Sequence, residues 1–205
     1  MSKAVVIDYG ASNTSSVVRA LEYLGHSVTL TSELKVVNSA DYLLLPGVGA
    51  FPDAMKKLKK TGLDNAIKRH IKNEKPIFGI CLGMQLLFTT GYEFKSVSGL
   101  NCIQGNVVRI LEENKTNNNI KVPNIGWRNL NTLKIKSNWK GTPFQKMNGY
   151  ESLYFAHSFK VVPKDLNIIL ANCEYGELEI PAAIKYKNIF GCQFHPEKSG
   201  PVGLE

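Results

Sequence analysis

The chain has 205 residues, a mass of 22.7 kDa and a formal net charge of +8, a size that suits one domain over residues 1–205. Its apolar content of 43% is ordinary for a globular protein, and no apolar run approaches the roughly 18 residues of a membrane span. The basic charge could indicate nucleic acid, but the lysines are spread over many segments without a recognition motif. We therefore expect neither nucleic acid nor a membrane as a partner.

The cysteines indicate a reducing compartment. Four are present, without C-x-x-C spacing, and they are too few for a disulfide framework in a chain of this length: Cys81, Cys102, Cys173 and Cys192. The N-terminus reaches the acidic Asp8 too early for a secretory signal. The sequence thus predicts a cytoplasmic protein with no metal site and no cofactor.

Strands alternate with helices in the first half of the chain. Apolar or β-branched segments predict strands at 3–8, 27–30, 42–45 and 76–80. Helical spacing follows at Val17, Leu21 and Leu24, ended by Gly25, and again at 51–72, with a break near Gly62, and at 82–90. This alternation predicts an α/β fold with a mostly parallel sheet flanked by helices. The turns at 8–13, 46–49 and 79–83 should then meet at the edge where ligands bind.

The second half is rich in short β segments, which predict an additional antiparallel layer. They lie at 105–110, 131–136, 153–156, 159–162, 168–171, 182–186 and 189–194. The asparagine-rich stretch 114–119 predicts an exposed loop.

A candidate nucleophile lies where the strand at 76–80 passes into a helix. Cys81 has a glycine two residues away on each side, Gly79 and Gly83, which is the pattern of a nucleophile elbow. The N-terminus of the following helix would favour a thiolate. Cys81 could equally be a buried apolar filler, and only a base elsewhere in the chain decides between the two.

Of the four histidines, His195 is the best candidate for that base. His26 follows a helix end and His70 lies on a lysine-rich helix, so we expect both at the surface. His195 ends the strand at 189–194, and Pro196 keeps the backbone extended, so that Glu197 can point to the same side and orient the imidazole. A chance surface turn is the alternative.

The two motifs together resemble the class I (triad) glutamine amidotransferases, which have a flavodoxin-like fold. The resemblance rests on the elbow at 79–85 and on Gln-Phe-His-Pro-Glu-Lys-Ser at 193–199. The segments 7–10, 46–51, 122–127 and 154–159 resemble, within this family, the glutaminase subunits of imidazole glycerol phosphate synthases of histidine biosynthesis. The resemblance extends over essentially the whole chain.

The resemblance implies hydrolysis of L-glutamine to glutamate and ammonia through a thioester. Cys81 would attack, His195 would act as acid and base, and Glu197 would orient His195. The oxyanion would be held by N–H groups of Leu82, Val48 and Gly49. Residues matching the family's glutamine contacts are Gly49, Gln85, Glu93, Ser158 and Phe159. Gln85 could instead be an ordinary polar helix position, and Glu93 a solvated loop acid.

The family also implies a partner, a (β/α)₈-barrel synthase subunit that receives the ammonia through a channel in a heterodimer. The products would be imidazole glycerol phosphate and AICAR, and the glutaminase would be poorly active until the partner binds. Residues matching the docking surface are Asn13, Asn124, Trp127, Tyr154 and Lys198.

Two departures from the family pattern keep a rival destination open. Ser12 and Asn124 stand where glycine and histidine are usual, and a paralogous glutaminase feeds ammonia to a surface-polysaccharide amidotransferase that makes an amidino sugar. A non-catalytic subunit and a cysteine protease of related fold are further alternatives. The intact triad counts against the first, and Gln85 with the His-Pro-Glu arrangement against the second.

Overall fold

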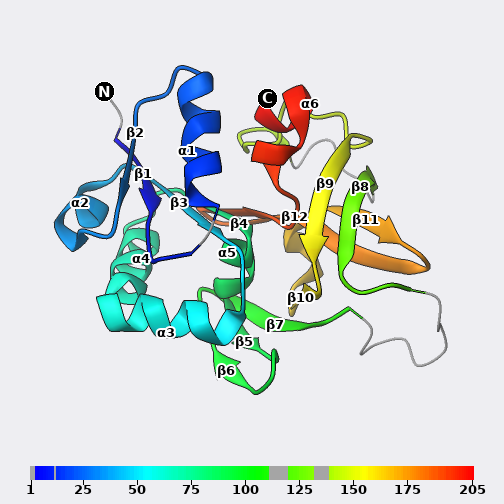
Figure 1. Cartoon of the computed structure of the whole chain (residues 1–205), viewed down its shortest axis with the longest axis horizontal. Coiled ribbons are helices and arrows are strands. Elements are labelled where there is room, and N and C mark those ends of the chain that lie inside the picture. Colours follow the sequence, from blue (N-terminus) through cyan, green and yellow to red (C-terminus); the bar gives the residue numbers. More distant parts are fainter. Residues whose placement is uncertain (1–2, 12, 111–119, 132–138) are drawn as a thin grey trace.

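The structure is a computed structural model that describes residues 3–11, 13–110, 120–131 and 139–205 (Figure 1). Ser12, the expected loop at 114–119 and most of the expected strand at 131–136 lie outside these residues. No helix in the described parts of the chain has both the length and the apolar character needed to span a membrane.

The main sheet has nine strands in the order β2-β1-β3-β4-β13-β12-β11-β8-β9. The first five run parallel: β2 (Val28–Thr31), β1 (Ala4–Ile7), β3 (Tyr42–Gly47), β4 (Ile77–Cys81) and β13 (Ile189–Cys192). The other four pair antiparallel: β12 (Leu178–Tyr186), β11 (Ile169–Tyr175), β8 (Asn124–Asn131) and β9 (Ser152–His157). The antiparallel strands therefore continue the parallel sheet through the β13–β12 pair.

A second sheet of four strands has the order β10-β7-β5-β6. Its strands are β10 (Phe159–Pro163), β7 (Ile103–Arg109), β5 (Phe88–Gly91) and β6 (Val97–Ser98). Only β5 and β7 pair in parallel among them. This sheet is the separate β layer of the fold, and its strand β10 follows directly after β9, so the two sheets meet at the segment between His157 and Phe159.

Helices cover both faces of the main sheet because its strands alternate apolar side chains between two cores. They are α1 (Thr14–Tyr23), α2 (Leu34–Ser39), α3 (Phe51–Thr61), α4 (Leu63–Lys72), α5 (Leu82–Leu86) and α6 (Gly200–Leu204), with 3₁₀ turns at Leu166–Ile168 and Pro196–Lys198. Val5 and Ile7 of β1 pack into the core with α3, α4 and α5, whereas Val6 packs with Val17 of α1 in the other. The predicted break between α3 and α4 is confirmed, since Gly62 has a φ of 72°.

The helix expected at 82–90 is wrong in its second half. Helix α5 ends at Leu86, and the chain enters β5 at Phe88. Leu86, Leu87 and Phe88 are all fully buried, so this continuous apolar run gives no periodicity that separates a helix from a strand. Pairing with β7 decides in favour of the strand.

His70 was expected at the surface and is instead 3% exposed. It shares the buried stripe of α4 with Leu63 and Ile67, at helical spacing, and its Nε2 lies 2.9 Å from the Pro76 carbonyl oxygen. Burial lowers the pKa of His70, although the hydrogen bond to Pro76 acts in the opposite direction.

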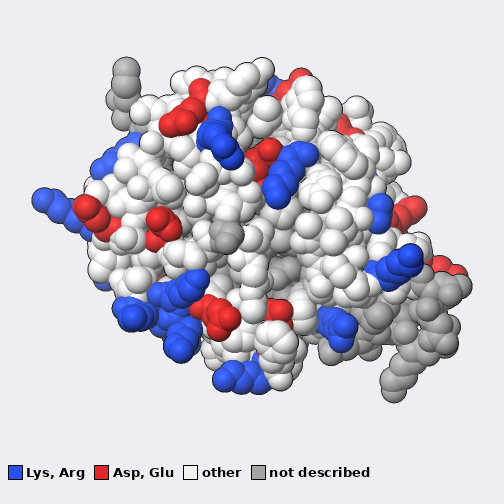
Figure 2. Space-filling model, in the orientation of Figure 1, with Lys and Arg blue, Asp and Glu red and all other residues white. Residues whose placement is uncertain are grey.

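The lysine cluster of α3 covers the exposed face of that helix. Lys56, Lys57, Lys59 and Lys60 are exposed, while Met55 and Leu58 are buried. Figure 2 shows basic side chains gathered over this region, with acidic side chains beside them and over the rest of the visible face. The cluster thus fits the polar side of an amphipathic helix.

Candidate active site

Cys81 ends β4 and precedes α5 with a φ of 53° and a ψ of −111°. Such a backbone costs a non-glycine residue about 1–3 kcal/mol. The flanking glycines are required for a different reason, because α5 packs closely on the sheet. A Cβ on Gly83 would lie 1.6 Å from the Leu45 carbonyl oxygen, and one on Gly79 would lie 2.8 Å from the Met84 nitrogen. The strain of the elbow therefore falls on Cys81 itself.

His195 and Glu197 come together in the turn after β13. The distance from His195 Nδ1 to Glu197 Oε1 is 2.8 Å, and the two side chains are 2% and 1% exposed. Because a carboxylate only accepts, Nδ1 carries a proton and Nε2 is left for Cys81. Burial lowers the pKa of His195, but hydrogen bonds and charge interactions with Cys81 and Glu197 outweigh it and raise this pKa to about 9. Burial likewise opposes ionisation of Glu197, yet its bond with His195 leaves the carboxyl pKa below its usual value.

Ser199 fixes this turn to strand β9. Its hydroxyl donates to the His195 carbonyl oxygen at 2.7 Å and accepts from the Tyr154 N–H at 2.9 Å. The His195 N–H in turn donates to the Tyr154 carbonyl oxygen at 2.8 Å. Ser199 lies in the quoted motif, but sequence reasoning assigned it no role.

Asn13 also contacts the triad. Its Nδ2 donates to Glu197 Oε1 at 2.6 Å, from a left-handed residue with a φ of 77° just before α1. We expected Asn13 on the docking surface, whereas the structure turns its side chain onto Glu197. The two residues are 184 positions apart, so no local signal in the sequence links them.

A pocket of about 220 Å³ opens beside Cys81. It collects every residue predicted for glutamine or for the oxyanion: Val48, Gly49, Leu82, Gln85, Glu93, Ser158 and Phe159. Leu82 begins α5, so its N–H has no partner within the helix. Gly49 has a φ of 115°, which glycine adopts without strain.

Gln85 and Glu93 are both tied into the structure. Gln85 is 5% exposed, and its Nε2 donates to the Phe159 carbonyl oxygen and to Gln193 Oε1, each at 2.9 Å. Glu93 Oε2 accepts from the Phe51 N–H at 2.7 Å and so satisfies the first turn of α3. Both side chains are thus bonded within the protein, and their contact with glutamine stays a prediction.

Residues 5–203 match the model of the family "Glutamine amidotransferase class-I". The chain belongs to this family. It is 47% identical over 202 residues to "Imidazole glycerol phosphate synthase subunit HisH" of Caldanaerobacter subterraneus subsp. tengcongensis, covering 98% of this chain and 93% of that protein. It is 43% identical to the protein of the same name of Lactococcus lactis subsp. lactis, with coverage of 99% and 95%.

Solved structures of the same fold are more distant in sequence. One described as "Crystal structure of glutamine amidotransferase" matches with a TM-score of 0.70 and 17% identity, over 98% of this chain and 94% of that one. The glutaminase domain of Trypanosoma brucei CTPS with bound acivicin matches with a TM-score of 0.65 and 17% identity, over 100% and 91%. The family predicted from the motifs and the α/β fold predicted from the alternation of strands and helices are thus confirmed.

In this amidotransferase Asn124 is an interior residue. It begins β8 with 0% exposure, and its Nδ2 lies 3.1 Å from His157 Nε2 while its Oδ1 accepts from Arg128. The expectation that its side chain faces a partner therefore differs from the structure. Asn124 is the first residue of a strand that the sequence analysis did not predict, which is why its burial was missed.

The other three residues predicted for the docking surface are accessible to different degrees. Trp127 is 51% exposed and packs edge-on against the half-buried Tyr154 with ring centres 6.2 Å apart, and Lys198 is exposed. Ile125, on the same strand as Trp127, is 56% exposed. Two large apolar side chains thus face outward from β8.

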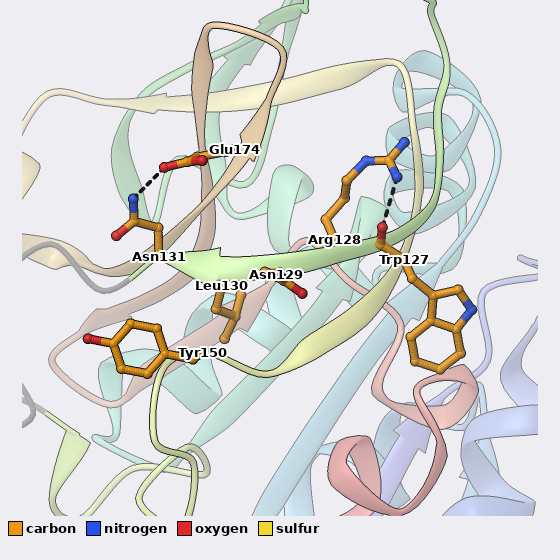
Figure 3. Close-up of a pocket in the computed structure, with 7 residues that line it drawn as sticks. All are labelled: Trp127, Arg128, Asn129, Leu130, Asn131, Tyr150 and Glu174. Carbon is orange, nitrogen blue, oxygen red and sulfur yellow. Dashed lines mark hydrogen bonds between the residues drawn. The ribbon is translucent and has the colours of Figure 1, made fainter.

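A hollow of about 510 Å³ continues this surface along β8, with Trp127 and Tyr150 at opposite ends (Figure 3). Three of its polar side chains, those of Arg128, Asn131 and Glu174, are bonded to the protein itself. Arg128 donates to the Trp127 carbonyl oxygen, and Asn131 donates to Glu174. Across the residues that the structure describes, no group of three or more His, Cys, Asp or Glu side chains could hold a metal ion.

Proposed function

We propose that this chain is the glutaminase subunit of an imidazole glycerol phosphate synthase. Residues 1–205 would act as one domain in the cytoplasm, hydrolyse L-glutamine and pass ammonia to a (β/α)₈-barrel synthase subunit. The observation that carries the proposal is the hydrogen-bonded His195–Glu197 pair behind Cys81, at a pocket sized for a small ligand. The names of the relatives supply the pathway.

The first half of the reaction would form a thioester. Cys81 gives its proton to His195 Nε2, and the thiolate attacks the side-chain amide carbon of glutamine. Donors at Leu82 and at the Val48–Gly49 loop would stabilise the oxyanion, each such donor contributing a factor of roughly 10²–10³ in rate. The imidazolium then protonates the amide nitrogen, and ammonia leaves as the carbon–nitrogen bond breaks.

The second half would hydrolyse the thioester. Neutral His195 takes a proton from water, the hydroxide attacks the thioester carbon, and the carbon–sulfur bond breaks. Glutamate leaves and the His195 proton returns to Cys81. Glu197 holds the same imidazole tautomer in both halves, which is why one histidine can serve as acid and then as base.

The side-chain oxygen of Gln85 is available for the substrate. The Gln85 nitrogen is committed to Phe159 and Gln193, and no bond to the oxygen is recorded within the described residues. Gln85 and Glu93 both line the pocket, so this oxygen would accept from an N–H group of glutamine and the Glu93 carboxylate would attract the ammonium group.

The exposed pair Trp127 and Ile125, with Tyr154 and Lys198, supports docking of the barrel at the edge formed by β8 and β9. Docking there would reach the triad, because Tyr154 is bonded to both His195 and Ser199. Without the partner we expect low glutaminase activity, since the oxyanion loop contains two glycines, Gly47 and Gly49, and can adopt more than one conformation.

The test uses Cys81→Ala in the purified complex. Glutamine-dependent synthesis should be lost, while added ammonia should still support synthesis, because only the supply of ammonia is removed. Lys56→Ala, an exposed change on α3, serves as the control and should keep both activities. Loss of ammonia-dependent synthesis in Cys81→Ala would contradict the channelled scheme.

The acceptor is tested in the same complex with two compounds, the histidine-pathway ribonucleotide and a nucleotide-linked acetamido sugar. We expect turnover of the ribonucleotide. Asn124, which raised the sugar pathway as a rival, is buried and bonded to His157 and Arg128, so its departure from the family pattern supports no change of partner. Turnover of the sugar alone would overturn the assignment.

A further inference from the structure

The Cys81 sulfur has an amide neighbour that the triad does not explain. Gln193 directly follows β13 and is 0% exposed, and its Nε2 lies 3.5 Å from Cys81 Sγ. The carbonyl oxygen of Ala156 lies 4.0 Å from the same sulfur. Gln193 thus places an N–H donor against the reacting atom.

The orientation of this amide is determined by its neighbours. The Phe159 carbonyl oxygen can only accept, so the nitrogen of Gln85 must face it. The same nitrogen donates to the oxygen of Gln193, which leaves the nitrogen of Gln193 toward Cys81. A flipped Gln193 would oppose two NH₂ groups and turn its oxygen toward the sulfur.

The arrangement suits a thiolate better than a thiol. A neutral thiol is a weak acceptor, so a fully buried amide recovers little of its lost hydration by bonding to one. A thiolate accepts a charge-assisted bond of about twice the strength. An apolar side chain of the same size would fill the site equally well if packing were its only purpose.

We propose that the Gln193 side-chain amide stabilises the Cys81 thiolate through an N–H···S hydrogen bond, and that Gln85 and the Phe159 carbonyl hold the amide in its donating orientation. This inference rests on the proposed glutaminase function and adds a residue to its machinery. Gln193 keeps both protons throughout. It would act when the proton of Cys81 has moved to His195, and again when the sulfur leaves the thioester carbon.

The same chain of bonds joins the nucleophile to the substrate pocket. Phe159 and Gln85 both line that pocket, and Gln193 connects Gln85 to the sulfur. Glutamine bound to the Gln85 oxygen would leave these bonds in place, so the donor would remain on Cys81 when the pocket is occupied.

Alkylation of Cys81 by iodoacetamide tests the proposal without glutamine or a partner. The full-length chain is treated at pH 7, and modification of the Cys81 peptide is followed by mass spectrometry. Gln193→Met keeps the size of the side chain and removes the donor, so we expect a roughly tenfold lower alkylation rate. Gln193→Glu keeps an acceptor for Gln85 but sets a carboxylate against the sulfur, and we expect a loss of roughly 100-fold.

The pH profile separates thiolate stabilisation from a merely structural role. In Gln193→Met the rise of the alkylation rate should move to higher pH, although this substitution leaves unchanged the titratable groups that act on Cys81: His195, Tyr9 and Cys192. Gln193→Glu adds a carboxylate beside the sulfur and should move the rise further in the same direction. Gln104→Met, the same substitution at an exposed glutamine, should behave as wild type. In the complex, Gln193→Met should lower kcat for glutamine about tenfold and change KM little.

A wild-type alkylation rate and pH profile in folded Gln193→Met would overturn the proposal while leaving the glutaminase function standing. If neither the wild type nor any variant hydrolyses glutamine, and only the Gln193 variants are alkylated slowly, the glutaminase function fails while the Gln193–Cys81 bond stands. If the variants do not fold, the side-chain ¹⁵N–H resonances of the glutamine residues in the otherwise unchanged protein test the bond. One of them should shift on Cys81→Ala, and an unchanged set would refute the bond.

Discussion

His195, in the turn after β13, and His157, at the end of β9, are both buried, yet their pKa values move in opposite directions. Burial lowers both. Around His195, bonds and charges of Cys81 and Glu197 reverse this and raise the pKa to about 9. Around His157 burial prevails, aided by the positive charges of His195 and Arg128, and the pKa falls to about 4 although the Phe159 carbonyl opposes it.

The partners of each ring explain the difference in role. His157 Nδ1 donates to the Phe159 carbonyl oxygen at 2.9 Å, so Nε2 accepts from the amide of Asn124. These neutral partners hold a neutral ring with both nitrogens occupied, which suits a structural residue. His195 has one nitrogen bound to a carboxylate and the other facing a thiol, so it can gain and lose a proton. An ionisable partner, rather than burial, distinguishes the catalytic histidine.

Glu197→Gln should have the largest effect, because it removes the carboxylate that makes His195 differ from His157. Without the carboxylate, burial of His195 is no longer offset to the same extent, so its pKa should fall and its tautomer should be less well held. We expect a loss of roughly 10³–10⁴-fold in kcat for glutamine hydrolysis in the complex. NMR titration of the His195 ring protons measures the pKa, and Glu22→Gln on the exposed face of α1 is the control. An activity within threefold of wild type would assign the orienting role elsewhere.

His157 should make the folded protein less stable in acid. The unfolded chain protonates this histidine near pH 6.5 and the folded protein only near pH 4, so its stabilising contribution is complete above 6.5 and is lost as the pH falls between these values. The loss should reach about 3 kcal/mol in the free energy of unfolding. In His157→Leu this part of the acid loss should disappear, as measured by urea unfolding from pH 4 to 7.

His195 should show the opposite sign. Its contribution is complete below pH 6.5 and is lost as the pH rises toward 9, because the folded protein then holds a proton that the unfolded chain releases. Glu197→Gln should reduce this alkaline loss, and His157→Leu should not. His26→Leu, at an exposed histidine, is the control for both series. The same slope in wild type and His157→Leu on the acid side would contradict the assignment.

Asn13 should contribute a smaller effect through Glu197. Asn13→Gly removes the donor while keeping a residue that tolerates a φ of 77°, and we expect about a tenfold lower kcat for glutamine in the complex. Asn13→Asp sets a second carboxylate against Glu197 and should lower kcat further. Asn101→Gly is a matched control, because Asn101 is also left-handed, with a φ of 55°, and lies away from the pocket.

The smallest effect is expected at Tyr9, a buried titratable group. Its hydroxyl has no hydrogen-bond partner among the described residues, and a Cβ on Gly47 would lie 2.1 Å from it. Burial, with a lesser effect of Cys81, raises the pKa of Tyr9. Tyr9→Phe should stabilise the fold by about 1 kcal/mol in urea unfolding, whereas Tyr23→Phe, 81% exposed, should not. Destabilisation by Tyr9→Phe would reveal a bond to this hydroxyl.

Sequence reasoning succeeded where a pattern is local. The alternation of strands and helices, the break at Gly62 and the family were readable from periodicity and two short motifs, and these are confirmed. It failed where an apolar run had no period, as at 86–88, and where a long-range pairing creates a strand from polar residues, as in β8. His70 was wrongly expected at the surface, because a histidine can share the apolar stripe of a helix.

The sequence by itself determined the family, four of the five parallel strands and the residues that could form a triad, because each depends on spacing within a few positions. The fifth strand, β13, was expected in the antiparallel layer and instead pairs in parallel with β4. Only the tertiary structure decided what those residues touch. Asn13 meets Glu197 across 184 positions, and Gln193 meets Cys81 across 112. The pKa values of His195 and His157 depend on such contacts, because the charge and hydrogen bonding of neighbours decide which protonation state is stable. Those neighbours are defined only when distant segments of the chain fold together.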